Sequence, residues 1–242
     1  DGDSLSSAIE VEVSFPGHHS DQWILQALDD DTFKANLHEF PVPLTDRLID
    51  AMRFLDVLGR SNSEFDITSF RLASISDHPQ NSYVHGLGVL ILLVRNSFDS
   101  LLAVNAAKAI LIAQLWKDID YPIFRRLYLY AAVSIGSPLD SLTLLQLTHD
   151  NGKLLWSSAT MREVKRYLRR RVLYWSREMQ IELIKSIRLG PSRALYKDMT
   201  DTEWSTHKAW LISRLLLKLQ QGGVELRTQD SDGIPKYAPP PP

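Results

Sequence analysis

The sequence contains no cysteine. This absence excludes disulfide bonds, thiolate metal ligands and a cysteine nucleophile. It fits a reducing compartment, although exported proteins can also lack cysteine, and on this basis we expect a cytoplasmic protein.

An excess of either charge is also missing. The chain has 27 Lys and Arg residues against 29 Asp and Glu residues, which gives a formal net charge of -2. Hydrophobic residues make up 44% and charged residues 23%, the balance of an ordinary globular protein. The overall charge therefore predicts neither a nucleic-acid nor a membrane partner.

No apolar run is long enough to cross a membrane. The longest uninterrupted run extends from Gly86 to Val94 and is bounded by His85 and Arg95. It has about half of the ~20 residues that a transmembrane helix needs. A buried helix explains it better, and we expect no membrane association.

Neither end of the chain looks like a natural terminus. The sequence begins at Asp1 without an initiating Met and without the basic and apolar regions of a signal peptide. It ends in four consecutive prolines, Pro239 to Pro242. We therefore expect a fragment of a longer polypeptide.

What the sequence does contain is apolar residues at helical spacing along most of its length. Capping residues, prolines and glycines divide this pattern. Thr45 is expected to be an N-cap, and Asp99-Ser100 and Asn151-Gly152 are expected to be turns. We expect roughly ten helices, over about residues 21–40 with a break at 29–31, 45–59, 66–75 (a short helix or a turn), 83–98, 100–118, 122–135, 139–149, 161–175, 177–188 and 201–221.

This pattern predicts an all-α fold, either stacked antiparallel helix pairs of the HEAT-like kind or an irregular helical bundle. The helical-stack domain is expected over 21–221. Residues 1–20 are expected to be a flexible or short extended segment, and 222–242 a Pro-rich tail or linker. No exact repeat period is visible, but degenerate helical repeats often hide theirs.

No sequence motif commits the chain to a chemistry. Phosphate-binding loops, zinc-protease and serine-hydrolase motifs are all missing from the sequence. We therefore expect no catalytic residue, no cofactor and no metal.

One dipeptide offers an alternative, because His149-Asp150 resembles the metal-binding pair of helical metal-dependent phosphohydrolases. A His upstream and an Asp downstream would complete such a set, and the candidates are His78, His85, Asp198 and Asp201. The simpler interpretation is that Asp150 ends a helix before the Asn151-Gly152 turn.

A helix junction follows the most apolar part of the chain. Pro122 suits the first turn of a new helix, and acidic residues before it favour the positive end of that helix. Of the two arginines that follow, one must point toward neighbouring helix ends and bond free carbonyls or acidic turn residues. The residues with this expected structural role are Trp116, Asp118, Asp120, Pro122, Arg125 and Arg126.

The spacing Trp116-x5-Pro122-Ile123-x-Arg125-Arg126 resembles helical-repeat segments of large bacterial anti-phage defence proteins. In these proteins, HEAT-like arrays lie C-terminal to an NTPase or SIR2-type effector domain. The resemblance covers residues 101–132. It implies a sensor or oligomerisation scaffold and carries over no catalytic residue.

The most suggestive charge feature is a basic helix. Four of its arginines share one broad face, while Tyr167, Leu168, Val172 and Leu173 are expected to pack inward. Such a face can hold phosphates or an acidic partner, or it can be a solvated face paired with Glu163, Glu178 and Glu182. The candidate binding residues are Arg162, Lys165, Arg166, Arg169, Arg170 and Arg171.

The sequence therefore predicts a non-catalytic interaction or scaffold module of a larger intracellular bacterial protein. Its partner would be another protein or other domains of the same polypeptide. The alternatives are a nucleic-acid-binding helical module that uses residues 162–171 and a metal-dependent phosphohydrolase that uses His149 and Asp150.

Overall fold

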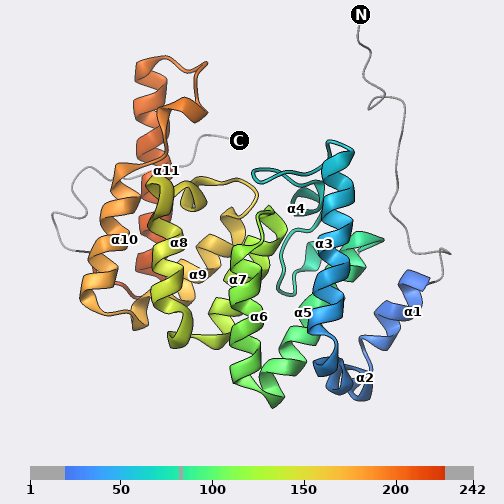
Figure 1. Ribbon diagram of the computed structural model, residues 1–242. Coiled ribbons are helices and arrows are strands. Elements are labelled where there is room, and N and C mark those ends of the chain that lie inside the picture. The colour runs from blue at the N-terminus through green and yellow to red at the C-terminus, as the bar shows by residue number, and fades with distance from the viewer. Residues whose placement is uncertain (1–19, 82–83, 227–242) are drawn as a thin grey trace, which may run out of the picture. The chain divides into compact units, whose positions relative to one another are not determined.

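The computed structural model describes residues 20–81 and 84–226 and has an all-α fold (Figure 1). Within this part of the chain, extended pairing is limited to a single bridge between Ser61 and Asp66. The expectations for residues 1–19 and 227–242 lie outside the described residues. The α-helices are α1 (Ser20–Ala27), α2 (Asp31–Asn36), α3 (Pro41–Val57), α4 (Ile67–Arg71), α5 (Leu87–Val104), α6 (Ala106–Asp118), α7 (Pro122–Ile135), α8 (Ser137–Trp156), α9 (Met161–Arg171), α10 (Arg177–Leu189) and α11 (Asp201–Gln221).

The chain divides into two compact units, with the boundary between Ala131 and Ala132, inside α7. The first unit contains α1 to α6 and most of α7. The second contains the end of α7 and α8 to α11. Each unit has buried apolar residues of its own.

Helix α5 is the core helix of the first unit. It packs against α1, α2, α3, α4, α6 and the short 3₁₀ helix Leu37–Glu39. Its residues Ile91, Val94 and Phe98 are fully buried. By length and a mean hydropathy of 1.7 this helix also resembles a membrane span. Packing on so many neighbouring elements is the pattern of a core helix.

The predicted turn at Asp99-Ser100 is wrong, because α5 runs through it to Val104. Both polar side chains are used in long-range contacts: Asp99 accepts a hydrogen bond from the Tyr130 hydroxyl, and Ser100 donates to the Ala35 carbonyl. The break falls instead at Asn105. Its side chain accepts from the Lys108 amide and so caps α6.

The predicted N-cap at Thr45 is also wrong. Helix α3 begins four residues earlier, with Pro41 in the first turn, where a missing N–H costs nothing. Thr45 is instead fully buried within α3, and its hydroxyl accepts a hydrogen bond of 3.0 Å from Trp116 Nε1. Trp116 also packs its ring against Phe98, with the ring centroids 5.1 Å apart.

The first turns of α4 and α7 share one carboxylate. Asp66 is fully buried and accepts from the Ser69 amide at 2.6 Å and from the Ile123 amide at 2.8 Å. Asp118 and Asp120, the acidic residues expected before Pro122, have other partners, since Asp118 pairs with Lys117 and Asp120 with Arg125. A buried charge with two backbone donors is well satisfied at the positive ends of two helices.

Of the two arginines at the start of α7, Arg126 is the one that turns inward. It is 1% exposed and donates to the carbonyls of Ser69 and Leu72, at the end of α4. Arg125 reaches the Ser63 carbonyl as well as Asp120. Helix α4 is thus held at its first turn by Asp66 and at its last by Arg126.

In the second unit, α8 packs on α9 and α10, and α11 packs on α9 and α10 (Figure 1). The predicted turn at Asn151-Gly152 is present, because Asp150, Asn151 and Gly152 all have positive φ. Helices α9, α10 and α11 begin where the sequence predicted. Helix α11 has a capping box, in which Thr200 and Glu203 satisfy each other's backbone amides.

We predict that Asp66→Ala lowers the free energy of unfolding by about 3 kcal/mol, because it leaves buried amide donors without an acceptor. Urea denaturation followed by circular dichroism measures this loss. Asp50→Ala is the matched control, since Asp50 is an exposed carboxylate paired with Arg47 and Arg53, and it should change stability by less than about 0.5 kcal/mol. Equal losses in the two variants would contradict the role of Asp66.

Candidate functional site

The six basic residues predicted as a binding face all lie on α9, but they do not act as one set. Arg162, Arg169 and Arg170 are exposed, and Lys165 is half-buried. Arg166 is also partly buried and has interactions of its own within the protein. The opposite side of the helix buries Glu163, Val164, Tyr167 and Leu168.

The expected inward packing holds for Tyr167, Leu168 and Val172 but is wrong for Leu173, which is 46% exposed. The α-helix ends at Arg171, and a 3₁₀ turn follows from Val172 to Tyr174. A 3₁₀ turn has three residues per turn, so the periodicity of α9 does not continue into it.

Arg171 has a structural role. Its guanidinium donates to Asp140 at 2.8 Å, and the Tyr167 hydroxyl donates to the other oxygen of the same carboxylate at 2.8 Å. Burial, and then the neighbouring Asp140 charge, raise the pKa of Tyr167, so this phenol stays a donor. Gly136 has a φ of 85°, and a Cβ there would lie 3.2 Å from the Arg171 guanidinium. A residue without a side chain is therefore needed at this close approach.

Lys165 lies where α9 packs on α11. Burial, and then the positive charges of Arg214, Lys218 and Arg162, together lower the pKa of Lys165 to about 8. The charged groups that act on this amine are thus all cations, from two helices. We call Arg162, Lys165, Arg214 and Lys218 the basic surface.

Sequence spacing and one close contact show how α9 and α11, the two helices of the basic surface, lie relative to each other. Arg162 and Lys165 are three residues apart on α9, and Arg214 and Lys218 four apart on α11, so each pair shares a face. At the end of α11, Gly222 lies against the backbone of Arg169, where a Cβ would be 2.5 Å from the Arg169 carbonyl oxygen. The helices therefore approach closely, and their cations converge.

Aromatic rings continue along α11 from the basic surface. Arg214 lies over the Trp210 ring, 4.4 Å from its centroid, which holds the guanidinium in place without a carboxylate. The ring of His207 is 5.5 Å from that of Trp210, and Tyr196 packs on both Trp204 and His207. From Trp204 to Lys218 this strip is about 21 Å long at 1.5 Å per residue.

The loop before α11 is fixed by Arg193. Its guanidinium donates to the carbonyls of Tyr196 and Met199, pairs with Asp201 at 3.7 Å and lies over the Trp204 ring. This cation is therefore used in shaping the loop and in positioning the first aromatic ring of the strip.

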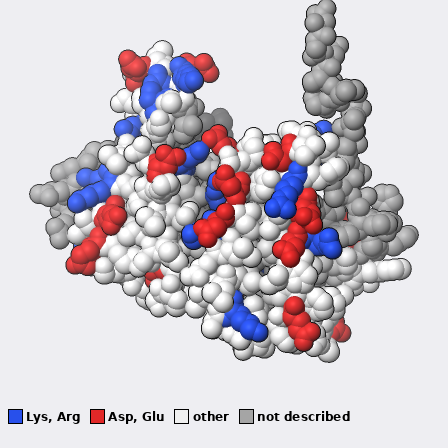
Figure 2. All heavy atoms as spheres, in the orientation of Figure 1, with Lys and Arg blue, Asp and Glu red and all other residues white. Residues whose placement is uncertain are grey.

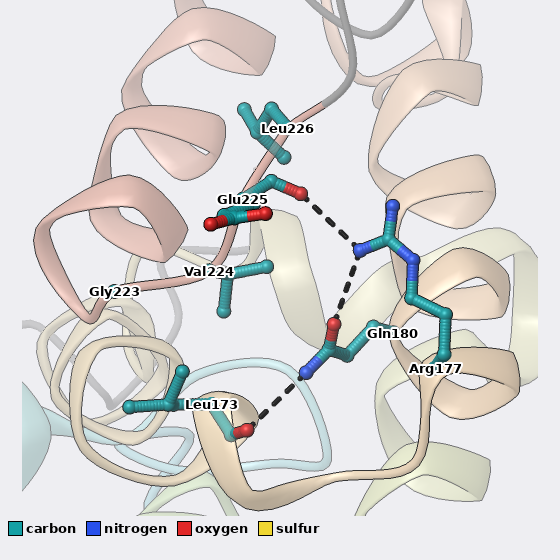
Figure 3. Close-up of a pocket in the computed structure, with 7 residues that line it drawn as sticks. All are labelled: Leu173, Arg177, Gln180, Gly223, Val224, Glu225 and Leu226. Carbon is teal, nitrogen blue, oxygen red and sulfur yellow. Dashed lines mark hydrogen bonds between the residues drawn. The ribbon is translucent and has the colours of Figure 1, made fainter.

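A pocket of about 520 Å³ lies at the C-terminal end of α11 (Figure 3). Its polar groups bind each other: Arg177 donates to the Gln180 side chain and to the Glu225 carbonyl, and Gln180 donates to the Leu173 carbonyl. Figure 3 shows this chain of hydrogen bonds crossing the pocket. We interpret it as a brace for the segment Gly223–Leu226, because it ties Arg177 and Gln180 to the backbone on both sides of the pocket.

The dipeptide of the metal hypothesis is exposed and lies in a turn. His149 and Asp150 have non-helical backbone angles inside α8. Across residues 20–81 and 84–226, no group of three or more His, Cys, Asp or Glu side chains is arranged to hold a metal ion. The structure thus gives His149 and Asp150 no further ligand within those residues.

Charges on the face drawn in Figure 2 are intermixed, with acidic and basic side chains next to each other in several places. This agrees with the near balance of the composition. The cations around Lys165 are notable against that background, because no carboxylate contributes to its pKa shift.

Comparisons with known proteins add no relative. No family model matches the chain, and searches of curated proteins and of solved structures found no match either. The resemblance to helical regions of anti-phage defence proteins therefore stays a prediction.

The sequence analysis missed Arg214 and Lys218, which belong to the basic surface, and Trp210, whose ring lies against Arg214. The signal was the spacing of Trp210, Arg214 and Lys218 at four-residue intervals, which places them on one side of α11. Their position beside α9 depends on tertiary packing.

We predict that Lys165 reacts with acetic anhydride with a midpoint near pH 8, because only the neutral amine reacts and its pKa is lowered to about 8. An unperturbed lysine has a pKa of about 10.4. Arg214→Gln removes a neighbouring positive charge and should move the midpoint upward, whereas Arg47→Gln in the first unit should leave it unchanged. Peptide mass spectrometry after brief labelling across pH 6–11 measures it. A midpoint above pH 10 in the parent protein would contradict the cation cluster.

Proposed function

We propose that this chain is a non-catalytic helical binding module whose second unit binds single-stranded nucleic acid through the basic surface. The observation that carries this proposal is the half-buried amine of Lys165, whose charged neighbours are all cations. Like charges at close range raise the free energy of the unbound surface. A phosphate backbone supplies the missing negative charge and displaces counterions.

The aromatic strip favours a single-stranded nucleic acid over other polyanions. Sites for single strands combine a cationic track with aromatic side chains on which bases stack. Here Arg214 and Trp210 provide a guanidinium plane and a ring within 4.4 Å of each other, and Trp204 and His207 follow along the same helix. Duplex recognition would instead need an element that enters a groove.

Arg171 is not part of this proposed site, since its charge is neutralised by Asp140. Arg169 and Arg170 are exposed and extend the positive charge along α9. The site therefore differs from the face predicted from sequence, because it exchanges Arg166 and Arg171 for two cations of α11.

A protein partner is a second candidate, favoured by exposed apolar side chains in the first unit. Phe54, Val57 and Phe70 are 49%, 86% and 61% exposed. Phe65 and Phe70 stack with ring centroids 5.3 Å apart. Exposed aromatic side chains are enriched at protein interfaces. The scaffold role in a larger bacterial defence protein belongs to this candidate and rests on the sequence resemblance.

We predict that replacing Arg162, Lys165, Arg214 and Lys218 together by Gln weakens binding of a fluorescein-labelled thymidine 20-mer about 100-fold at 0.1 M salt. The slope of log affinity against log salt should fall by about 3, as expected for four lost phosphate contacts on a single strand. Fluorescence anisotropy across a salt series measures both quantities.

The matched control replaces Lys34, Arg47, Arg53 and Lys108, all in the first unit, by Gln and has the same net charge. It should retain parental affinity. If both variants lose the same affinity, binding follows net charge alone and the basic surface is not the site.

A second experiment distinguishes binding of nucleic acid from binding of other polyanions. Trp210→Ala removes a stacking ring and should weaken binding of the 20-mer about tenfold, while heparin binding, which loses only the support of Arg214, should weaken much less. Equal effects on both ligands would contradict base stacking and favour an acidic protein partner.

A further inference from the structure

The first unit contains a cavity that the proposed function does not use. It has a volume of about 420 Å³ and is lined by the end of α3, by α4 and by the residues that lead into α5. Ligand sites for small molecules span about 300–1,000 Å³. Leu55, Leu72, Val84 and Ile91 are buried side chains that line it, so part of its wall is apolar.

Cationic side chains line the same cavity. Arg60 and Arg71 belong to it, and His85 is a third basic residue. No described residue forms a hydrogen bond or an ion pair with either guanidinium group. In this respect they differ from Arg95, Arg125 and Arg126 of the same unit, which donate to carbonyl oxygens.

Two carboxylates of this region accept hydrogen bonds from backbone amides. Asp66 accepts from the amides of Ser69 and Ile123, and Asp21 accepts from the Gly86 amide at 2.8 Å. The start of α5 is therefore occupied by a negative charge of the protein itself. An acid group that enters the cavity would meet guanidinium donors at Arg60 and Arg71 that no described residue uses.

We infer that this cavity binds a small amphipathic anion, an apolar body that carries one carboxylate or phosphate group. The apolar body packs on the buried leucine, valine and isoleucine side chains. The acid group pairs with Arg60 and Arg71, whose planar donors match carboxylate and phosphate oxygens. Neither a purely apolar molecule nor an inorganic anion uses both parts of the site.

The test is isothermal titration calorimetry of the full chain with four probes: decanoate, decyl phosphate, decanol and inorganic phosphate. We expect decanoate or decyl phosphate to bind with one-to-one stoichiometry and at least about tenfold more tightly than decanol, the effect of a charge-assisted hydrogen bond. The stronger of the two acids identifies the head group. Decanol binding as tightly as both acids would overturn the inference, as would inorganic phosphate binding as tightly as decyl phosphate.

Variants locate the acid group. Arg60→Gln with Arg71→Gln should weaken the preferred acid at least about tenfold and leave decanol unchanged. Arg47→Gln with Arg53→Gln, which removes two cations from α3, should retain parental affinity. Equal affinity in the two double variants would overturn the inference. Thermal unfolding of both confirms that they are folded, and the probe comparison on the parent protein stands without them.

The test of the cavity can succeed or fail independently of the test of nucleic-acid binding. The cavity lies in the first unit and the basic surface in the second. The double variant of Arg60 and Arg71 should still bind the thymidine 20-mer, and the quadruple variant of the basic surface should still bind the amphipathic acid.

Discussion

The first unit depends on one buried carboxylate that serves two helices. Asp66 accepts from amides in the first turns of α4 and α7, and the α7 amide, that of Ile123, is 57 residues away from Asp66 in the chain. Both helix dipoles present their positive ends to the same charge, so the desolvation of Asp66 is offset by two sets of donors. Arg126, on α7, completes the arrangement by binding the carbonyls at the other end of α4. A helix of five residues has little stability of its own and is ordered by these contacts.

A related solution occurs in the second unit, where Asp140 in the first turn of α8 binds Tyr167 and Arg171 of α9. This contact explains why arginines on the same helix, α9, have different roles. Arg171, on the inner side, becomes part of the packing. Arg162, on the outer side, stays at the surface and adds to the field around Lys165. Composition alone does not distinguish the two.

Local signals were enough to predict much of the fold. Helix ends were predicted correctly at Pro122, at the Asn151-Gly152 turn and at the glycines after α11. Each of these residues acts through its own backbone conformation. The predictions were wrong where contacts with a residue distant in sequence determine whether a helix ends or continues. Asp99-Ser100 has the composition of a turn, yet Tyr130 and Ala35 use its polar groups while α5 continues. The basic helix was visible in sequence, but its α11 neighbours are a product of packing.

The depressed basicity of Lys165 has a thermodynamic consequence for any ligand of the basic surface. A neighbouring anion favours the protonated amine, so complex formation takes up a proton from solution near pH 8. By linkage, raising the pH through this range releases the ligand, while acidification retains it. Lys165, which lowers the stability of the unoccupied basic surface, thus makes ligand binding there depend on pH. No change of backbone conformation is required.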